Sequence, residues 1–254
     1  MQRVIVVGDL HGCAEETIQL LHKCEVKPED RVIFVGDLVD RGPDNDKCVD
    51  LVMNRELIQG SPACVMGNHE EKMLFYREIE QRRGSVEVQI PNHIATRKQL
   101  KPKHYEYFKT LPKFIELPEH NAIVVHAGMY PDRPLAKQTD RHLLHIQSIR
   151  PFDKLGYPTF NEKSMWPTKV PKHEEGWKFW TEFWKGPERI IFGHSVLDVP
   201  LITDKVAGVD GGCCFGRELW ALVLPDWNIV SVKSKTHCDK GRNPVRIHGN
   251  VGTF

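Results

Sequence analysis

Short apolar runs that each end in a polar, metal-ligating residue recur along the chain, and they constrain the fold more than any other feature. Three such runs lead into Gly-Asp-Leu-His-Gly at 8–12, Gly-Asp-Leu-Val-Asp-Arg-Gly at 36–42 and Gly-Asn-His-Glu at 67–70. Two more end at His126 and His194. Runs of this kind, bounded by glycine, are typical of buried strands in an α/β sheet. We therefore expect the polar residues to gather at the sheet edge where such folds bind ligands.

Six side chains at these strand ends offer the donor atoms of a metal site: Asp9, His11, Asp37, Asn68, His126 and His194. Carboxylate and amide oxygens mixed with imidazole nitrogens suit manganese, iron or zinc better than calcium or magnesium. Six ligands are too many for one catalytic zinc ion, which usually takes three from the protein. They suit two divalent ions roughly 3.5–4 Å apart that share one carboxylate and clamp a phosphoryl group. We expect two metal ions per chain, with manganese favoured and iron or zinc as alternatives.

Each of these residues, taken alone, has an ordinary structural interpretation. A single aspartate after a strand is often the N-cap of the next helix, and Asp9 and Asp37 each have that alternative. A single histidine is more often structural, and nearly all of the nine histidines outside the motifs are interpreted in that way. The metal interpretation depends on the combination, because five strand ends of one design are not expected by chance.

The motifs GDLHG, GDLVDRG, GNHE, VHAG and FGH occur in this order and closely resemble those of the phosphoprotein-phosphatase family of dinuclear metallophosphoesterases. The resemblance covers about residues 4 to 235. It implies an α/β, calcineurin-like fold, with a central β-sandwich of mixed sheets flanked by helices and a helical cap. It also implies that Asp9, His11 and Asp37 hold one metal ion, and that Asp37 bridges to a second. The other ligands of the second ion are then Asn68, His126 and His194.

The same resemblance gives three further residues a role in phosphoryl transfer. It implies that His69 protonates the leaving oxygen, that Asp40 orients His69, and that Arg41 grips the phosphoryl oxygens. These roles make independent chemical sense, because imidazole titrates near neutrality and a carboxylate partner favours its protonated form. A guanidinium can hold two phosphate oxygens with a bidentate fork. The ordinary alternative for Asp40 and Arg41 is a surface ion pair.

A second phosphate-binding arginine is normal in the family between the VHAG and GH motifs. Arg150 is our assignment, because its distance from His126 resembles the spacing in short bacterial and phage phosphatases. Arg141 is the alternative.

The substrate is less constrained than the chemistry. The segment 209–216 resembles the small bacterial, phage and ApaH-like members of the family, some of which cleave diadenosine tetraphosphate while others dephosphorylate proteins. A phosphate ester of serine or threonine has a poor leaving group and needs a strong general acid, so the Asp40–His69 pair favours phosphomonoesters. We therefore expect a serine/threonine phosphatase-like enzyme that uses in-line attack of a metal-bound hydroxide. The alternative substrate is a dinucleoside tetraphosphate or polyphosphate, which would be cleaved at a pyrophosphate linkage.

Composition bears on the partners and the compartment. The formal net charge of +1 gives no strong nucleic-acid signal and disfavours a nuclease or other phosphodiesterase. A non-catalytic binding protein is also disfavoured, because no ligand or catalytic histidine is lost. No apolar run approaches the length of a membrane span. The seven scattered cysteines are interpreted as reduced thiols, and with no room for a signal peptide we expect a cytoplasmic protein.

The organisation expected along the chain is a single domain over 1–254, with a helical cap insert at 71–113 and a loosely packed tail at 237–254. Apolar spacing predicts four helices and two late strands. The helices are expected at Glu15–Lys23, Cys48–Asn54, Met73–Gln81 and His104–Leu111, and the strands at Leu219–Leu224 and Ile229–Val232.

Overall fold

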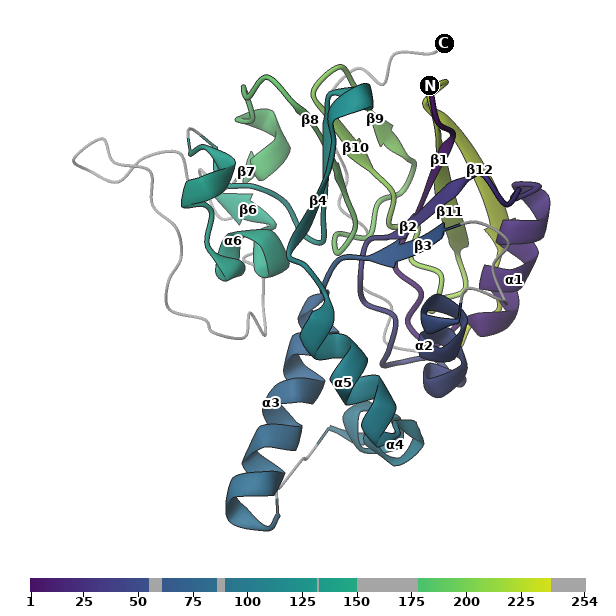
Figure 1. Ribbon diagram of the computed structural model, residues 1–254, viewed down its shortest axis with the longest axis vertical. Coiled ribbons are helices and arrows are strands. Elements are labelled where there is room, and N and C mark those ends of the chain that lie inside the picture. Colours follow the sequence, from purple (N-terminus) through teal and green to yellow (C-terminus); the bar gives the residue numbers. More distant parts are fainter. Residues whose placement is uncertain (55–60, 86–89, 132, 150–177, 239–254) are drawn as a thin grey trace.

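Two five-stranded β-sheets face each other at the centre of the molecule, a computed structural model that describes residues 1–54, 61–85, 90–131, 133–149 and 178–238 (Figure 1). The strands of the first sheet are β1 (Val4–Val7), β2 (Arg31–Phe34), β3 (Ser61–Cys64), β11 (Glu218–Leu224) and β12 (Asn228–Lys233). Their spatial order is β12-β11-β1-β2-β3. The first three strands of the chain are parallel, whereas β11 pairs antiparallel with both of its neighbours.

The second sheet is also mixed. Its strands are β4 (Phe114–Leu117), β5 (Ala122–Val125), β8 (Arg189–Phe192), β9 (Leu201–Ile202) and β10 (Val206–Gly208), in the order β4-β5-β8-β10-β9. The three central strands are parallel, and an antiparallel strand closes each edge. The short strands β6 (Ser148–Ile149) and β7 (Lys178–Phe179) form a separate pair. The expected α/β sandwich of two mixed sheets is therefore confirmed.

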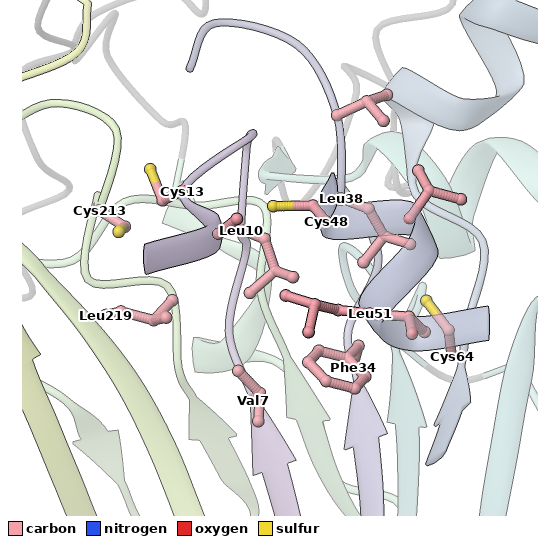
Figure 2. Close-up of a cluster of buried hydrophobic side chains, with 14 of the residues drawn as sticks. Val7, Leu10, Cys13, Phe34, Leu38, Cys48, Leu51, Cys64, Cys213 and Leu219 are labelled. Carbon is pink, nitrogen blue, oxygen red and sulfur yellow. The ribbon is translucent and has the colours of Figure 1, made fainter. Parts of the chain in front are cut away.

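Both faces of the central strands are buried, which explains why their sequences are apolar at every position. Val6 of β1 and Ile33 of β2 point toward the opposite sheet, where they meet Val124 and Ile191 in a core between the sheets. The alternate residues Val7 and Phe34 point outward into a second core, beneath the neighbouring helices (Figure 2). This period-two alternation fixes the strand register, because a shift by one residue would exchange the two cores.

Helices cover the outer faces of the sheets (Figure 1). The elements α1 (Ala14–Lys23) and α2 (Asn45–Met53) lie on the first sheet, and α6 (Asp140–His145) lies beside β6 and β7. Three more helices project away from the sheets as the helical cap: α3 (Asn68–Arg83), α4 (Pro91–Gln99) and α5 (Pro102–Thr110). Short 3₁₀ turns occupy Pro118–His120, Leu135–Lys137 and Trp180–Glu182.

The predicted helices and late strands are present with small shifts in their bounds, but α4 was not predicted. Pro91 is the first residue of α4, a position where proline is tolerated because the missing N–H has no partner in the first turn. Within the described residues, no helix is both long and apolar enough to cross a membrane.

Candidate metal centre

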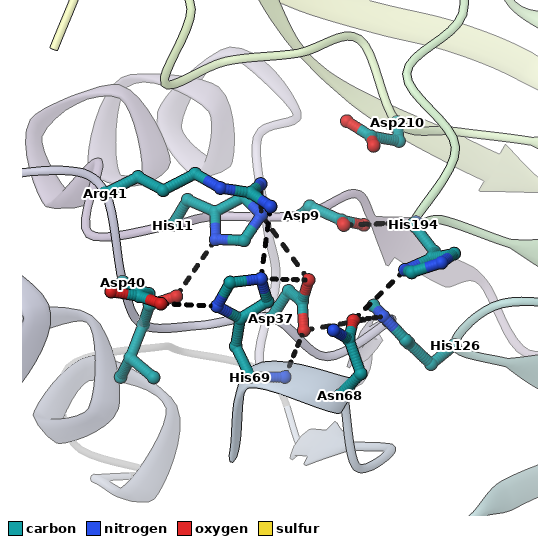
Figure 3. Close-up of polar contacts among 12 residues, drawn as sticks. Asp9, His11, Asp37, Asp40, Arg41, Asn68, His69, His126, His194 and Asp210 are labelled. Carbon is teal, nitrogen blue, oxygen red and sulfur yellow. Dashed lines mark hydrogen bonds and ion pairs between the residues drawn. The ribbon is translucent and has the colours of Figure 1, made fainter. Parts of the chain in front are cut away.

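The structure brings together all six side chains predicted from the strand ends (Figure 3). They come from the loops after β1, β2, β5 and β8 and from the first turn of α3, which follows β3: Asp9, His11, Asp37, Asn68, His126 and His194. All six are buried. Neither aspartate is a helix N-cap, since Cys13 precedes α1 and Asp44 precedes α2. The ends of parallel strands thus place all six donors at one edge of the sandwich.

Asp37 lies at the centre of this cluster, between two histidines (Figure 3). Nε2 of His11 lies 3.4 Å from Oδ2 of Asp37, and Nε2 of His126 lies 3.4 Å from Oδ1. Each oxygen of one carboxylate therefore faces a different imidazole. A carboxylate that bridges two metal ions requires this arrangement.

Hydrogen bonds on the far side of both imidazoles orient their lone pairs. Nδ1 of His11 donates to the carbonyl of Val39 at 2.9 Å, and Nδ1 of His126 donates to the carbonyl of Val35 at 2.8 Å. The Nε2 lone pairs are then directed into the site, as in metal-binding histidines whose other nitrogen is fixed by the protein. Burial also lowers the pKa of His126, which keeps the ring neutral and able to act as a ligand.

Asn68, His194 and Asp9 complete the cluster. Oδ1 of Asn68 lies 2.9 Å from Nε2 of His126 and 3.0 Å from Nδ1 of His194. Because Nε2 of His126 carries a lone pair, it and the amide oxygen are two acceptors that face each other, and a cation between them would stabilise both. The backbone N–H of His194 donates to both oxygens of Asp9, at 3.0 and 3.1 Å. The donor set and its geometry therefore fit two divalent metal ions.

Charge in the site is unevenly distributed among the carboxylates. Burial alone would raise the pKa of Asp37, but four surrounding imidazoles outweigh it and hold this pKa well below its ordinary value. In contrast, burial together with the charges of Asp210 and Asp37 raises the pKa of Asp9. The raised pKa reflects repulsion between buried carboxylates. Bound cations would offset that repulsion and stabilise the cluster.

Asp210 is a site residue that the sequence interpretation missed. It is buried and follows β10 with only Val209 between them, so it obeys the same strand-end pattern as the predicted ligands. The signal was present in the sequence, but β10 has only three residues and gives no apolar run long enough to identify a strand.

The backbone of the site adopts conformations that residues other than glycine rarely adopt. Five site residues have φ in the left-handed region: His11 (46°), Asp37 (50°), Asp40 (79°), Arg41 (76°) and His194 (62°). Such conformations cost about 1–3 kcal/mol each and persist only where the surroundings enforce them. Glu70 supplies part of that enforcement, because its buried carboxylate accepts the backbone N–H groups of Asp37 at 2.8 Å and Leu38 at 2.9 Å.

The predicted proton donor and its partner are in direct contact. Nδ1 of His69 lies 2.6 Å from Oδ2 of Asp40, which fixes the ring and directs its Nε2 toward the cluster (Figure 3). Nη2 of Arg41 lies 3.1 Å from this Nε2, and another guanidinium nitrogen contacts Nε2 of His11. Burial lowers the pKa of His69 to about 4 despite the opposing charge of Asp37. The negative charge of a phosphoryl group bound beside it would raise that pKa again.

The second arginine stays a prediction. Arg150 lies outside the described residues. Arg141, its alternative, lies on α6. Burial is the main cause of the lowered pKa of the adjacent His142, and the charges of Arg133 and then Arg141 lower this pKa further.

The chain is similar over nearly its whole length to one group of known proteins. Residues 2–232 match the model of the calcineurin-like phosphoesterase family. An asymmetrical bis(5'-nucleosyl)-tetraphosphatase from Oceanobacillus iheyensis is 26% identical, with 92% of this chain and 93% of the relative covered. A relative of the same name from Geobacillus thermodenitrificans is 28% identical, with coverages of 90% and 93%. A crystal structure of a candidate diadenosine tetraphosphatase has a TM-score of 0.73 and 29% identity, with coverages of 92% and 94%.

Proposed function

The chain belongs to the calcineurin-like phosphoesterase family and is a metal-dependent phosphoester hydrolase, and we propose that its substrates are bis(5'-nucleosyl) tetraphosphates. The observation that carries the chemistry is the carboxylate of Asp37, whose two oxygens face His11 and His126. The relatives support the substrate, since those named asymmetrical tetraphosphatases match along nearly their full length. This favours the alternative from the sequence over the expected serine/threonine phosphatase.

The proposed reaction is asymmetrical hydrolysis. Water adds to a terminal phosphorus of the tetraphosphate, the bond to the bridging oxygen breaks, and the products are a nucleoside triphosphate and a nucleoside monophosphate. Two divalent ions, with manganese favoured, would neutralise phosphoryl charge and activate the attacking water. The residues that would hold them are Asp9, His11, Asp37, Asn68, His126 and His194.

The protein's own contribution is positioning and proton transfer. Arg41 reaches into the cluster beside His69, where a guanidinium would bind the phosphoryl oxygens in the transition state. His69 would donate its Nε2 proton to the departing oxygen, and Asp40 would hold the ring in the productive orientation. Arg150 would supply the second guanidinium.

Phosphomonoester hydrolysis is the second candidate function, and one observation favours it. The 2.6 Å contact between His69 and Asp40 provides a built proton donor, which an alkoxide leaving group needs more than a phosphate leaving group does. The two functions use the same site, so relative kcat/KM values decide between them.

Product analysis tests the proposal. The manganese-loaded protein is incubated with diadenosine tetraphosphate, and nucleotides are separated by anion-exchange chromatography, with Asp37→Asn as the control for contaminating enzymes. We expect ATP and AMP in equal amounts. Formation of ADP alone would show symmetrical cleavage. Higher kcat/KM on a phosphoserine peptide than on the tetraphosphate would overturn the proposed substrate in favour of the second candidate.

A further inference from the structure

Asp40 has a second histidine partner that the reaction outlined above does not use. Nε2 of His93 lies 2.9 Å from Oδ2 of Asp40, the same oxygen that His69 contacts at 2.6 Å. The hydroxyl of Thr96 lies 3.1 Å from the other oxygen, Oδ1, and 2.9 Å from the carbonyl oxygen of Asn92, and these two acceptors share its one hydrogen. His93 and Asp40 are 5% and 1% exposed, so water does not compete for these contacts. The carboxylate is thus held by three side chains.

The hydrogen bonds of His93 fix which of its nitrogens carries the proton. A carboxylate oxygen only accepts hydrogen bonds, so Nε2 of His93 carries a hydrogen and donates it to Asp40. The hydroxyl of Tyr76 lies 3.0 Å from Nδ1, the other ring nitrogen. His93 therefore acts on Asp40 as a fixed N–H donor.

One side of α4 provides the contacts that hold this aspartate. His93 and Thr96 bind the carboxylate, and Gln99, three residues further on, accepts hydrogen bonds from Asn45 through its Oε1, at 2.8 and 3.0 Å. Asn45 in turn accepts the backbone N–H of Asp40 at 2.5 Å. Residues three apart lie on one side of a helix, so His93, Thr96 and Gln99 make all of these contacts from the same side of α4.

We propose that His93 is a positioning residue for the general acid: its N–H holds the Asp40 carboxylate, which in turn holds His69 for proton transfer. The helical cap thereby contributes to the chemistry through α4. The inference depends on the proposed role of His69 as the proton donor. It predicts an effect on substrates that need a proton at the leaving oxygen and little effect on those that do not.

A pair of aryl phosphates measures that need directly. The phenolate of phenyl phosphate is a poor leaving group and needs a proton on its oxygen, whereas the 4-nitrophenolate of 4-nitrophenyl phosphate departs without one. In the manganese-loaded enzyme, His93→Ala should lower kcat on phenyl phosphate by about 10- to 100-fold, the range for lost outer-shell partners. The loss on 4-nitrophenyl phosphate should be several-fold smaller, with KM little changed. His93→Gln, which restores an N–H donor, should recover part of the loss.

A control on the same helix separates positioning from cap stability. Arg97 lies on α4 and pairs with Glu80 of α3 at 3.0 Å. Arg97→Ala should leave the ratio of the two rates unchanged, even where it lowers the melting temperature. Metal content should be the same in wild type and in both His93 variants, because His93 is not proposed as a ligand.

The outcomes distinguish this inference from the function on which it rests. His69→Asn serves as the reference in the same assay. If His69→Asn loses more on phenyl phosphate than on 4-nitrophenyl phosphate while His93→Ala loses equally on both, the positioning role of His93 is overturned and the general acid stands. If His69→Asn itself shows equal losses, the proton-donor role fails and the role of His93 fails with it. Loss of metal in His93→Ala would show a ligand instead of a positioning residue.

Discussion

The backbone N–H of His69 donates to Oδ1 of Asp37 at 2.9 Å. The carboxylate proposed to bridge two metal ions therefore also fixes the first turn of α3, which carries the proposed proton donor. Metal binding and placement of the acid are linked through this one side chain, so a change at Asp37 affects both.

Replacing the proposed proton donor should affect substrates according to their leaving groups. His69→Asn keeps a polar side chain but removes the titratable ring, and it should lower kcat on phenyl phosphate by roughly 10²–10⁴-fold, the usual contribution of acid catalysis. The loss should be smaller on 4-nitrophenyl phosphate. Steady-state kinetics on the two esters provide the measurement, and equal losses would mean that His69 is structural.

The guanidinium of Arg41 should act on the transition state and not only on binding. It reaches His69 and His11 at the centre of the cluster, where the transferring phosphoryl group would lie. Arg41→Ala should therefore lower kcat and raise KM, with kcat/KM reduced by about 10²-fold or more. Arg41→Lys should recover only part, because an ammonium cannot form the bidentate contact. Arg82→Ala, which removes an exposed pair with Glu78 on α3, is the control. If Arg41→Ala raised KM and left kcat unchanged, the prediction would be contradicted.

The ligand set could be predicted from the sequence because it follows from one physical rule. Parallel strands place the residues after their C-terminal ends at one edge, so Asp9, Asp37 and His126 could be grouped without knowing the fold in detail. The apolar runs also indicated an α/β sheet, since strands buried on both faces have no polar positions, whereas the sandwich of two mixed sheets was implied by the family resemblance. The substrate could not be predicted in this way, and the relatives support the alternative that the sequence had placed second.

Other parts of the site depend on contacts that local patterns do not encode. His93 meets Asp40 because α4 packs against α2 and contacts Tyr76 of α3, and the proline at its first position concealed the helix. Glu70 was noted in a motif, but its hydrogen bonds to the backbone after β2 depend on the packing of α3 against that loop.

A methyl group at Gly193 should weaken metal binding selectively. A Cβ at this position would collide with Oδ1 of Asp9 and with the side chain of Val35, so the carboxylate must move. Gly193→Ala should lower metal affinity by about 10- to 100-fold, in the range seen for disturbed outer-shell partners. Titration of the metal-free protein with manganese measures this. Gly84→Ala is the control for a strained glycine position away from the site, since its φ is 74° but its added Cβ meets no atom within 4 Å. Equal affinities in the two variants would contradict the prediction.

The contact between α1 and the segment after β12 should make the free energy of unfolding depend on pH in the acidic range. Glu16 accepts hydrogen bonds from His237 at 2.9 Å and Ser234 at 2.8 Å. Burial would raise the pKa of Glu16, but these hydrogen bonds outweigh it and leave the pKa below its ordinary value. The folded state therefore favours the charged form. Its contribution is present above the unfolded pKa of about 4.3 and is lost as pH falls through the lower folded value.

Glu16→Gln should accordingly lower the free energy of unfolding by roughly 1.5–3 kcal/mol at pH 7, the range for hydrogen bonds to a charged group. The difference from wild type should shrink as the pH is lowered from 5 to 3, a range estimated from the reference pKa of about 4.3. Urea denaturation across this range provides the measurement. The neighbouring Glu15→Gln, which alters only exposed contacts with Lys235 and Gln19, should have a much smaller effect. A difference that grows on acidification would show that the sign is wrong.

The number of metal ions bound per chain tests the central claim most directly. The two oxygens of Asp37 face His11 and His126, so one carboxylate should serve both metal positions. Elemental analysis of manganese-loaded protein after removal of free metal should give two ions per chain in wild type. The same treatment of Asp37→Asn should leave both positions largely empty and the tetraphosphate uncleaved. Full activity in wild-type protein that contains no transition metal, or two ions retained by Asp37→Asn, would contradict the account.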